Sequence, residues 1–108
     1  MPLLMLILVG SIIAPINEEL VFRGALRRIF RNEKVFIIIS AIVFGLIHTI
    51  FAEESLLNAL VLAIPYATMG AGFAYVYAKT NNICTSIIAH MALNTIVTLG
   101  DILVMLIR

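Results

Sequence analysis

Six side chains with acid–base or hydrogen-bonding chemistry interrupt an otherwise apolar sequence. They are Glu18, Glu19, Arg23, His48, His90 and Asn94. A charged side chain at the centre of a bilayer costs about 2.5–3.5 kcal/mol, so such residues usually face a protein interior or a wet cavity and have a function there. Carboxylates, imidazoles and an amide gathered in one cavity would suit the hydrolysis of a substrate by water.

Hydrolysis would divide these groups into a base and an oxyanion site. A desolvated glutamate can act as a general base on water, and a histidine can hold that water in place. A second histidine and an asparagine can donate hydrogen bonds to the oxyanion of a tetrahedral intermediate. Ionisable groups at membrane depth also serve proton or ion relays. An asparagine four residues after a histidine, as at His90 and Asn94, favours the oxyanion site.

The spacing of the two glutamates predicts that one is paired and the other is free. Residues four apart share a helix face, so Glu19 can form an ion pair with Arg23. Glu18 lies about 100° round the helix from Glu19 and is left free to act as the base. Two further pairs have the same spacing of four residues: Phe44 with His48, and His90 with Asn94.

Glu18, His48 and His90 would also suit a divalent metal such as Zn²⁺. Two imidazoles and a carboxylate are a common set of zinc ligands. The three residues do not follow the H-E-x-x-H pattern, so separate helices would have to bring them together. The sequence leaves open whether a metal ion activates the water or the protein does so alone.

The composition is that of a membrane protein. The chain is 63% hydrophobic and 12% charged, whereas soluble domains are about 45–50% apolar and about 25% charged. Membrane lipids are therefore expected partners. The net charge of +1 gives no support for a nucleic-acid partner, and none is expected. Cys84 is the single cysteine, which excludes an internal disulfide.

Four apolar stretches predict an all-α, multi-pass membrane protein. Each is close to the roughly 17–25 residues that cross a hydrocarbon core as a helix, which is the default structure in lipid. Short polar connections make successive helices antiparallel neighbours. Residues 1–108 are thus expected to form one compact bundle of four transmembrane helices. The predicted helices are residues 3–30, 35–51, 56–78 and 83–107.

Basic residues in the connections predict the orientation in the membrane. Residues 27–34 are rich in arginine, and Lys79 lies in the third connection, whereas the second connection contains Glu53 and Glu54. Connections one and three are therefore predicted to be cytoplasmic. A rise of about 1.5 Å per residue then places four polar groups about 12–21 Å from the cytoplasmic plane. They are Glu18, His48, His90 and Asn94.

Three motifs in order, EELVFR, FGLIH and HMALN, resemble the CPBP family of intramembrane proteases. That family includes the type II CAAX prenyl endopeptidases and the Abi proteins linked to bacteriocin processing and immunity. Its pattern is E-E-x-x-x-R, then F-x-x-x-H, then H-x-x-x-N, and the sequence matches every position. The resemblance covers nearly the whole chain. It implies an endopeptidase in a prokaryotic cell membrane, acting on a membrane-associated peptide that is CAAX-prenylated or bacteriocin-like.

The resemblance also implies a role for each motif. Glu18 corresponds to the glutamate that activates the attacking water, and His48 to the histidine that assists it. Glu19 corresponds to the second glutamate, which the arginine at Arg23 holds, and Phe44 is a supporting residue. The HMALN motif supplies the pair proposed to stabilise the oxyanion. The family is often described as metalloproteases, and a mechanism without metal has also been argued for it.

One departure from the family concerns the N-terminal side. Family members usually carry further transmembrane helices before the E-E motif, and here only a short stretch precedes it. The chain is therefore expected to be a trimmed or minimal core, in which lipid or a second copy in a homo-oligomer completes the cavity wall. Two other functions fit the same residues, namely a non-enzymatic immunity or scaffold protein of the Abi type and a small proton relay.

Overall fold

A computed structural model describes residues 2–52 and 55–108. In these residues the protein is helical and contains no strand, so the predicted all-α class is confirmed. An N-terminal helix contains two π-helical segments, η1 and η2, and three further helices follow it. The elements are α1 (Leu3–Leu8), η1 (Val9–Ile13), α2 (Ala14–Glu19), η2 (Leu20–Ala25), α3 (Leu26–Ile29), α4 (Glu33–Thr49), α5 (Leu56–Thr80) and α6 (Ile83–Ile107).

Short polar residues begin three of these helices. The side chain of Asn32 accepts a hydrogen bond from the backbone of α4, and Ser55 does the same for α5. Asn82 caps α6, and Asn81 before it adopts the left-handed conformation (φ 50°) that ends α5. Such caps are typical of Asn and Ser, because their side chains satisfy the free N–H groups of a helix start. The connections therefore lie where the sequence predicts them, within two or three residues.

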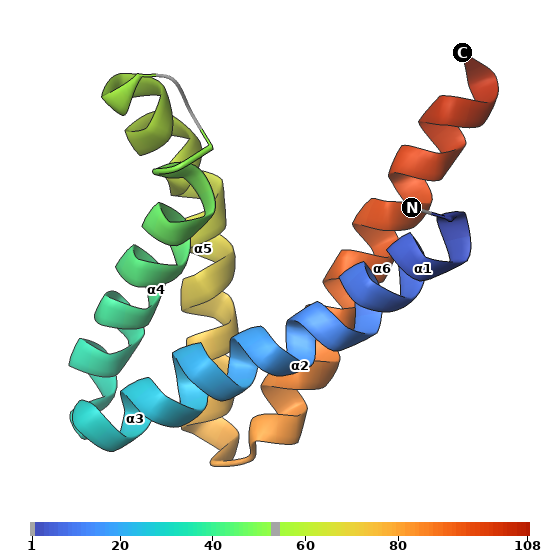
Figure 1. The fold of residues 1–108 in the computed structure, drawn as a ribbon. Helices are drawn as coiled ribbons and strands as arrows, with labels where there is room; N and C mark the ends of the chain where they lie inside the picture. The colour runs from blue at the N-terminus through green and yellow to red at the C-terminus, as the bar shows by residue number, and fades with distance from the viewer. Residues whose placement is uncertain (1, 53–54) are drawn as a thin grey trace.

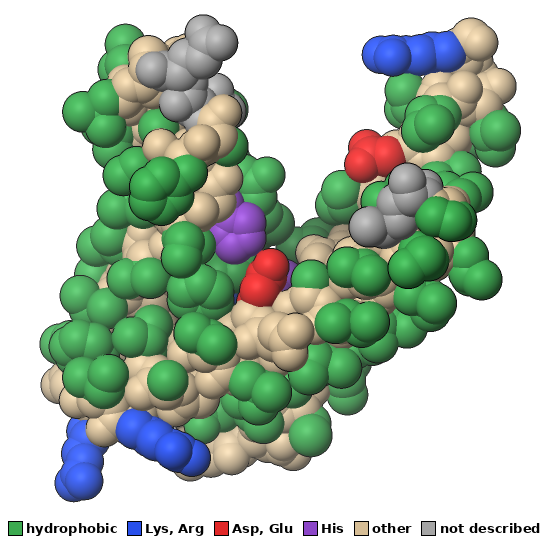
Figure 2. Space-filling model, viewed as in Figure 1, with side chains coloured by type: hydrophobic (Ala, Val, Ile, Leu, Met, Phe, Trp, Pro, Cys, Tyr) green, Lys and Arg blue, Asp and Glu red, His purple; other side chains and the backbone are tan. Residues whose placement is uncertain are grey.

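Among the described residues, three helices have the length and composition of a membrane span: Leu3–Ile29, α5 and α6. The fourth, α4, has 17 residues and so falls at the lower end of the range of roughly 17–25 residues that cross a membrane. The orientation of the second connection rested on Glu53 and Glu54, which lie outside the described residues. The first connection carries its predicted cluster of basic side chains at the end of the molecule remote from both termini (Figures 1 and 2).

The helices form two arms that meet at one end (Figure 1). In one arm α4 and α5 lie side by side as an antiparallel hairpin. In the other, η1 and α2 of the N-terminal helix run alongside α6, and the C-terminus lies at the far end of this arm. The space-filling view shows a hollow between the arms, with mainly apolar side chains over the outer surfaces (Figure 2). Glu18 and the imidazoles lie at the base of this hollow.

Glycine and alanine allow α4 and α5 to approach closely. A Cβ atom added to Gly45 would lie 2.8 Å from the backbone oxygen of Ala63 and 2.9 Å from the Cβ of Ala67. A Cβ atom at Gly70 would lie 2.9 Å from the Cβ of Phe44. Small residues at helix contacts are the usual basis of packing in lipid, where the hydrophobic effect does not hold helices together. This contact fixes the depth and facing of His48, because the histidine is three residues after Gly45.

We expect Gly45→Ala to destabilise the protein by about 1–3 kcal/mol, because the methyl group would push against the backbone of α5. Gly72→Ala is the matched control. A Cβ at Gly72 meets nothing within 4 Å, so alanine there should be neutral or stabilising by about 0.5–1 kcal/mol. Thermal unfolding in detergent micelles measures both. Equal unfolding midpoints for the two variants would contradict the close approach of α4 and α5 at Gly45.

Candidate active site

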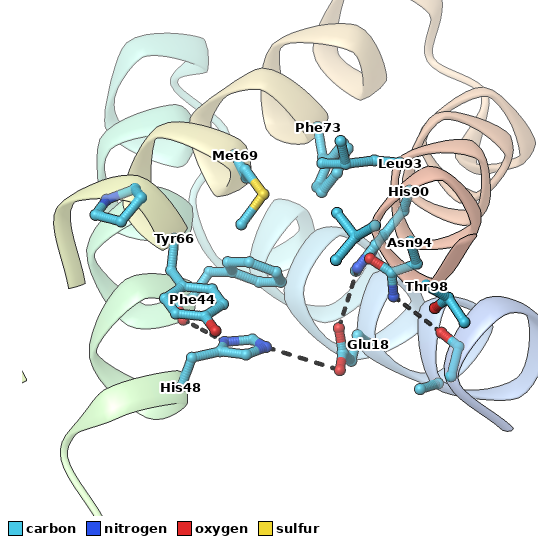
Figure 3. Close-up of a pocket in the computed structure, with 14 residues that line it drawn as sticks. Glu18, Phe44, His48, Tyr66, Met69, Phe73, His90, Leu93, Asn94 and Thr98 are labelled. Carbon is cyan, nitrogen blue, oxygen red and sulfur yellow. Dashed lines mark hydrogen bonds and ion pairs between the residues drawn. The ribbon is translucent and has the colours of Figure 1, made fainter. Parts of the chain in front are cut away.

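Glu18, His48 and His90 come from three helices and meet at the base of the hollow (Figure 3). One carboxylate oxygen of Glu18 lies 3.8 Å from Nε2 of His48, and the other lies 3.3 Å from Nε2 of His90. The side chain of Glu18 is 29% exposed, whereas that of His90 is only 3% exposed. The carboxylate therefore reaches into the open cavity while one of the imidazoles forms part of its wall.

Glu19 and Arg23 form the buried ion pair that their spacing predicts. Nε of Arg23 lies 3.1 Å from Oε1 of Glu19, and both side chains are fully buried. Nη2 of Arg23 donates a hydrogen bond of 3.0 Å to the backbone oxygen of Gly70. The guanidinium also lies over the rings of Phe44 and Phe73, at 4.9 and 5.5 Å from their centroids. A charge removed from water needs such partners, so Arg23 connects the N-terminal helix to α5.

The partners of both imidazoles fix which ring nitrogen carries the proton. Nδ1 of His48 lies 2.6 Å from the backbone oxygen of Phe44, and Nδ1 of His90 lies 2.7 Å from Oε2 of Glu19. A carbonyl oxygen can only accept, and so can an ionised carboxylate, so both Nδ1 atoms must donate. Nε2 of each ring therefore faces Glu18, and it presents a lone pair there when the ring is neutral. This arrangement requires a proton, a water molecule or a cation between the acceptors.

Aromatic rings hold the two imidazoles in place. Tyr66 stacks on His48 with centroids 4.9 Å apart and an angle of 14°, and Phe73 stacks on His90 at 4.5 Å and 16°. Phe44 lies between the imidazoles, 4.3 Å from one and 5.7 Å from the other. Phe44 was expected in a supporting role. Tyr66 and Phe73 were not predicted as site residues, and the available signal was their spacing of seven residues, which places them on one face of α5.

Asn94 lines the same cavity but is engaged elsewhere. Its Nδ2 donates a hydrogen bond of 2.9 Å to the backbone oxygen of Gly10 in η1. One hydrogen of its amide group therefore remains for another acceptor. Figure 3 shows this amide one turn along α6 from His90, on the side of the cavity that faces the N-terminal helix.

The cavity has a volume of about 560 Å³, which lies within the range of roughly 300–1,000 Å³ typical of ligand sites. Glu18, His48, His90 and Asn94 supply polar groups on one side. The rest of the lining is mainly apolar, and includes Met69, Leu93 and Val97. The cavity thus combines a small polar centre with an apolar wall that can receive an apolar chain.

Glu18, His48 and His90 have side chains of the right types to bind a metal ion, but the distances between them do not match a metal site. Glu18, His48 and His90 are of kinds that bind zinc, and a carboxylate behind a ligating histidine, as Glu19 is behind His90, is common in zinc sites. Within residues 2–52 and 55–108, however, no group of three His, Cys, Asp or Glu is spaced to hold a metal. The three side chains are therefore of the types that bind such an ion, but they are not spaced to hold it in this structure.

We expect Arg23→Met to destabilise the protein by about 3–5 kcal/mol, because it leaves the buried carboxylate of Glu19 without its counter-charge. The double variant Glu19→Gln/Arg23→Met should be more stable than Arg23→Met, since it removes both charges. Arg28→Met, at an exposed position, is the control and should be near neutral. Unfolding midpoints in micelles compare the four proteins. A double variant less stable than the single one would contradict the pairing.

Comparison with known proteins gives one family and several bacterial relatives. The model of a family described as type II CAAX prenyl endopeptidase Rce1-like matches residues 1–96. The Bacillus subtilis protein named "Putative membrane peptidase YdiL" is 35% identical over 101 residues, covering 88% of this chain and 36% of that protein. UPF0177 protein YxdF of Lactococcus lactis is 36% identical over 84 residues, covering 78% of this chain and 43% of that protein. No solved structure gives a significant match.

The chain spans less than half the length of these curated relatives. Its apolar helices of membrane-spanning length, together with relatives from bacteria, identify a multi-pass prokaryotic membrane protein. The matched residues 1–96 include all three motifs and the whole of the site around Glu18.

Proposed function

Because the chain belongs to the Rce1-like family of type II CAAX prenyl endopeptidases, we propose that it is the core of a membrane-embedded endopeptidase. The observation that carries the proposal is the position of Glu18 between the Nε2 atoms of His48 and His90. In a partly dry cavity, the carboxylate of Glu18 and the Nε2 lone pair of His48 can together bind a water molecule and remove its proton, with His90 beside them. The apolar lining suits a substrate that reaches the site from the membrane.

Glu18 and His48 would activate the water. Glu18 accepts one proton of the water while Nε2 of His48 accepts a hydrogen bond from the other hydrogen. The water oxygen then attacks the peptide carbonyl carbon, and the carbonyl becomes an oxyanion. Breakdown of this intermediate returns the proton from Glu18 to the leaving amine, so the products are a carboxylic acid and an amine. Stacking on Tyr66 holds the ring of His48 in position for this role.

His90 and Asn94 would stabilise the oxyanion. With a second proton on Nε2, His90 becomes an imidazolium that can donate to the oxyanion, and the carboxylate of Glu19 at Nδ1 balances its charge. The ion pair with Arg23 holds the carboxylate of Glu19 beside this ring. The hydrogen of Asn94 that does not bind Gly10 is the second donor. Glu19 and Arg23 thus act through His90 rather than on the water.

The apolar wall supports a membrane-associated peptide as the substrate class. The cavity opens between the two arms, and Met69, Leu93 and Val97 line it beyond the polar centre. A lipidated peptide, such as a prenylated C-terminal CAAX sequence, or an apolar bacteriocin-like peptide could place its chain there with little desolvation cost. The family description supports the first of these.

We expect Glu18→Gln to lower the rate of peptide hydrolysis by roughly 10²–10⁴-fold, the usual contribution of a general base. Glu33→Gln, which changes a carboxylate paired with Lys79 far from the cavity, is the control and should keep the wild-type rate. The assay uses the full chain in liposomes with a prenylated fluorogenic CAAX peptide. An active Glu18→Gln variant that folds and inserts would refute the proposed base and favour a binding role of the immunity type. Proton flux without cleavage would indicate a relay.

A divalent metal held by Glu18, His48 and His90 would polarise the attacking water as a Lewis acid. We expect removal of metal ions by a chelator to distinguish a metal-assisted reaction from one in which Glu18 acts as the base without a metal. If the metal takes part, dialysis against a strong chelator abolishes hydrolysis and added Zn²⁺ restores it. If Glu18 suffices, the rate survives chelation and the preparation contains less than one metal ion per chain. Elemental analysis of the purified protein checks the second point.

A further inference from the structure

Pro15 leaves one backbone carbonyl of the N-terminal helix without a donor. In η1 the N–H of Ala14 donates to the oxygen of Val9, five residues earlier. The next donor in this register would be residue 15, which would serve Gly10. Proline has no N–H, so the helix itself supplies no partner for the Gly10 oxygen. An unpaired carbonyl at a buried helix contact costs free energy comparable to a lost hydrogen bond.

Asn94 supplies that partner from a different helix. Its Nδ2 lies 2.9 Å from the Gly10 oxygen, across 84 positions of sequence. A Cβ at Gly10 would meet nothing within 4 Å, so the glycine is not needed to make room for α6. The contact with α6 therefore depends on the free carbonyl rather than on the absent side chain.

We propose that Asn94 is a positioning residue, whose amide replaces the N–H missing at Pro15 and locks α6 to the segment that carries Glu18. This segment, α2, has six residues between two π-helical segments. A change of one residue in the register of either segment would rotate α2 by about 100° and turn Glu18 away from the imidazoles. The hydrogen bond resists such a rotation, because it ties the carbonyl five residues before Pro15 to a fixed side chain.

The lock also links the two halves of the site. Asn94 is one turn from His90 on α6, and Pro15 is three residues from Glu18 in α2. Oε2 of Glu18 and Nε2 of His90 lie 3.3 Å apart. The hydrogen bond between Asn94 and Gly10 thus sets the distance between the helices that present Glu18 and His90. It does so before any substrate binds and uses only one of the two amide hydrogens.

A double-mutant cycle with Asn94→Ala and Pro15→Ala tests the lock. With alanine at position 15 the Gly10 oxygen gains a backbone donor, because the new N–H of residue 15 reaches it in the π-helical register of η1. Asn94→Ala should therefore lower the unfolding midpoint of the full chain in micelles by roughly 4–8 °C in the Pro15 background. In the Pro15→Ala background it should lower the midpoint by much less.

Equal shifts of the midpoint in both backgrounds would overturn the lock. Gly10→Ala is the control, because it keeps the carbonyl, and Asn94→Ala should still lower the midpoint in that background. These outcomes do not depend on hydrolysis. The consequence for catalysis rests on the proposed function: Asn94→Ala should lower kcat with KM little changed, and Pro15→Ala should recover part of that loss. The same fold-loss of kcat in both backgrounds would make Asn94 an oxyanion donor alone.

Discussion

The buried ion pair of Glu19 and Arg23 is the interaction on which the rest of the site depends. Two charges with no exposure to solvent require partners, and the protein supplies the ion pair itself, the backbone oxygen of Gly70 and the imidazole of His90. Arg23 reaches the backbone of α5 at Gly70, and Glu19 reaches His90 on α6. The pair therefore joins the N-terminal helix to α5 and to α6. Neither partner could be lost without leaving an uncompensated charge in an apolar interior.

The aromatic residues of α4 and α5 give this polar centre its shape. Tyr66, Phe73 and Phe44 enclose the two imidazoles, and Phe44 and Phe73 also lie beneath the guanidinium of Arg23. Rings can pack against both an imidazole and a cation because their faces carry partial negative charge. They also exclude water from one side of the site. The hydrogen bonds of the Nδ1 atoms then leave both Nε2 atoms directed at Glu18.

The two arms of the molecule explain how such a centre can still be reached. α4 and α5 pack along their length through small residues, whereas the outer half of α6 diverges from them (Figure 1). The resulting hollow is apolar at its sides and polar at its base (Figure 2). Two curated relatives are covered by this chain to only 36% and 43% of their length, so they contain further residues outside the matched region.

The sequence by itself determined the helices and the pairing of Glu19 with Arg23, because both follow from local periodicity: apolar runs of membrane length and a spacing of four residues on one helix face. It also indicated that Glu18, His48 and His90 lie at similar depth in the membrane, because the rise per residue of a helix gives the height of each residue from its position in the sequence. Only the tertiary structure decided what depends on azimuth and on contacts between helices. The stacking of Tyr66 and Phe73, the acceptor at Gly70 and the engagement of Asn94 by Gly10 are of this kind. The π-helical segments on either side of α2 change the direction in which its side chains point, and a regular repeat of 3.6 residues per turn does not predict this change. The direction of Glu18 was therefore set by packing rather than by its spacing in the sequence.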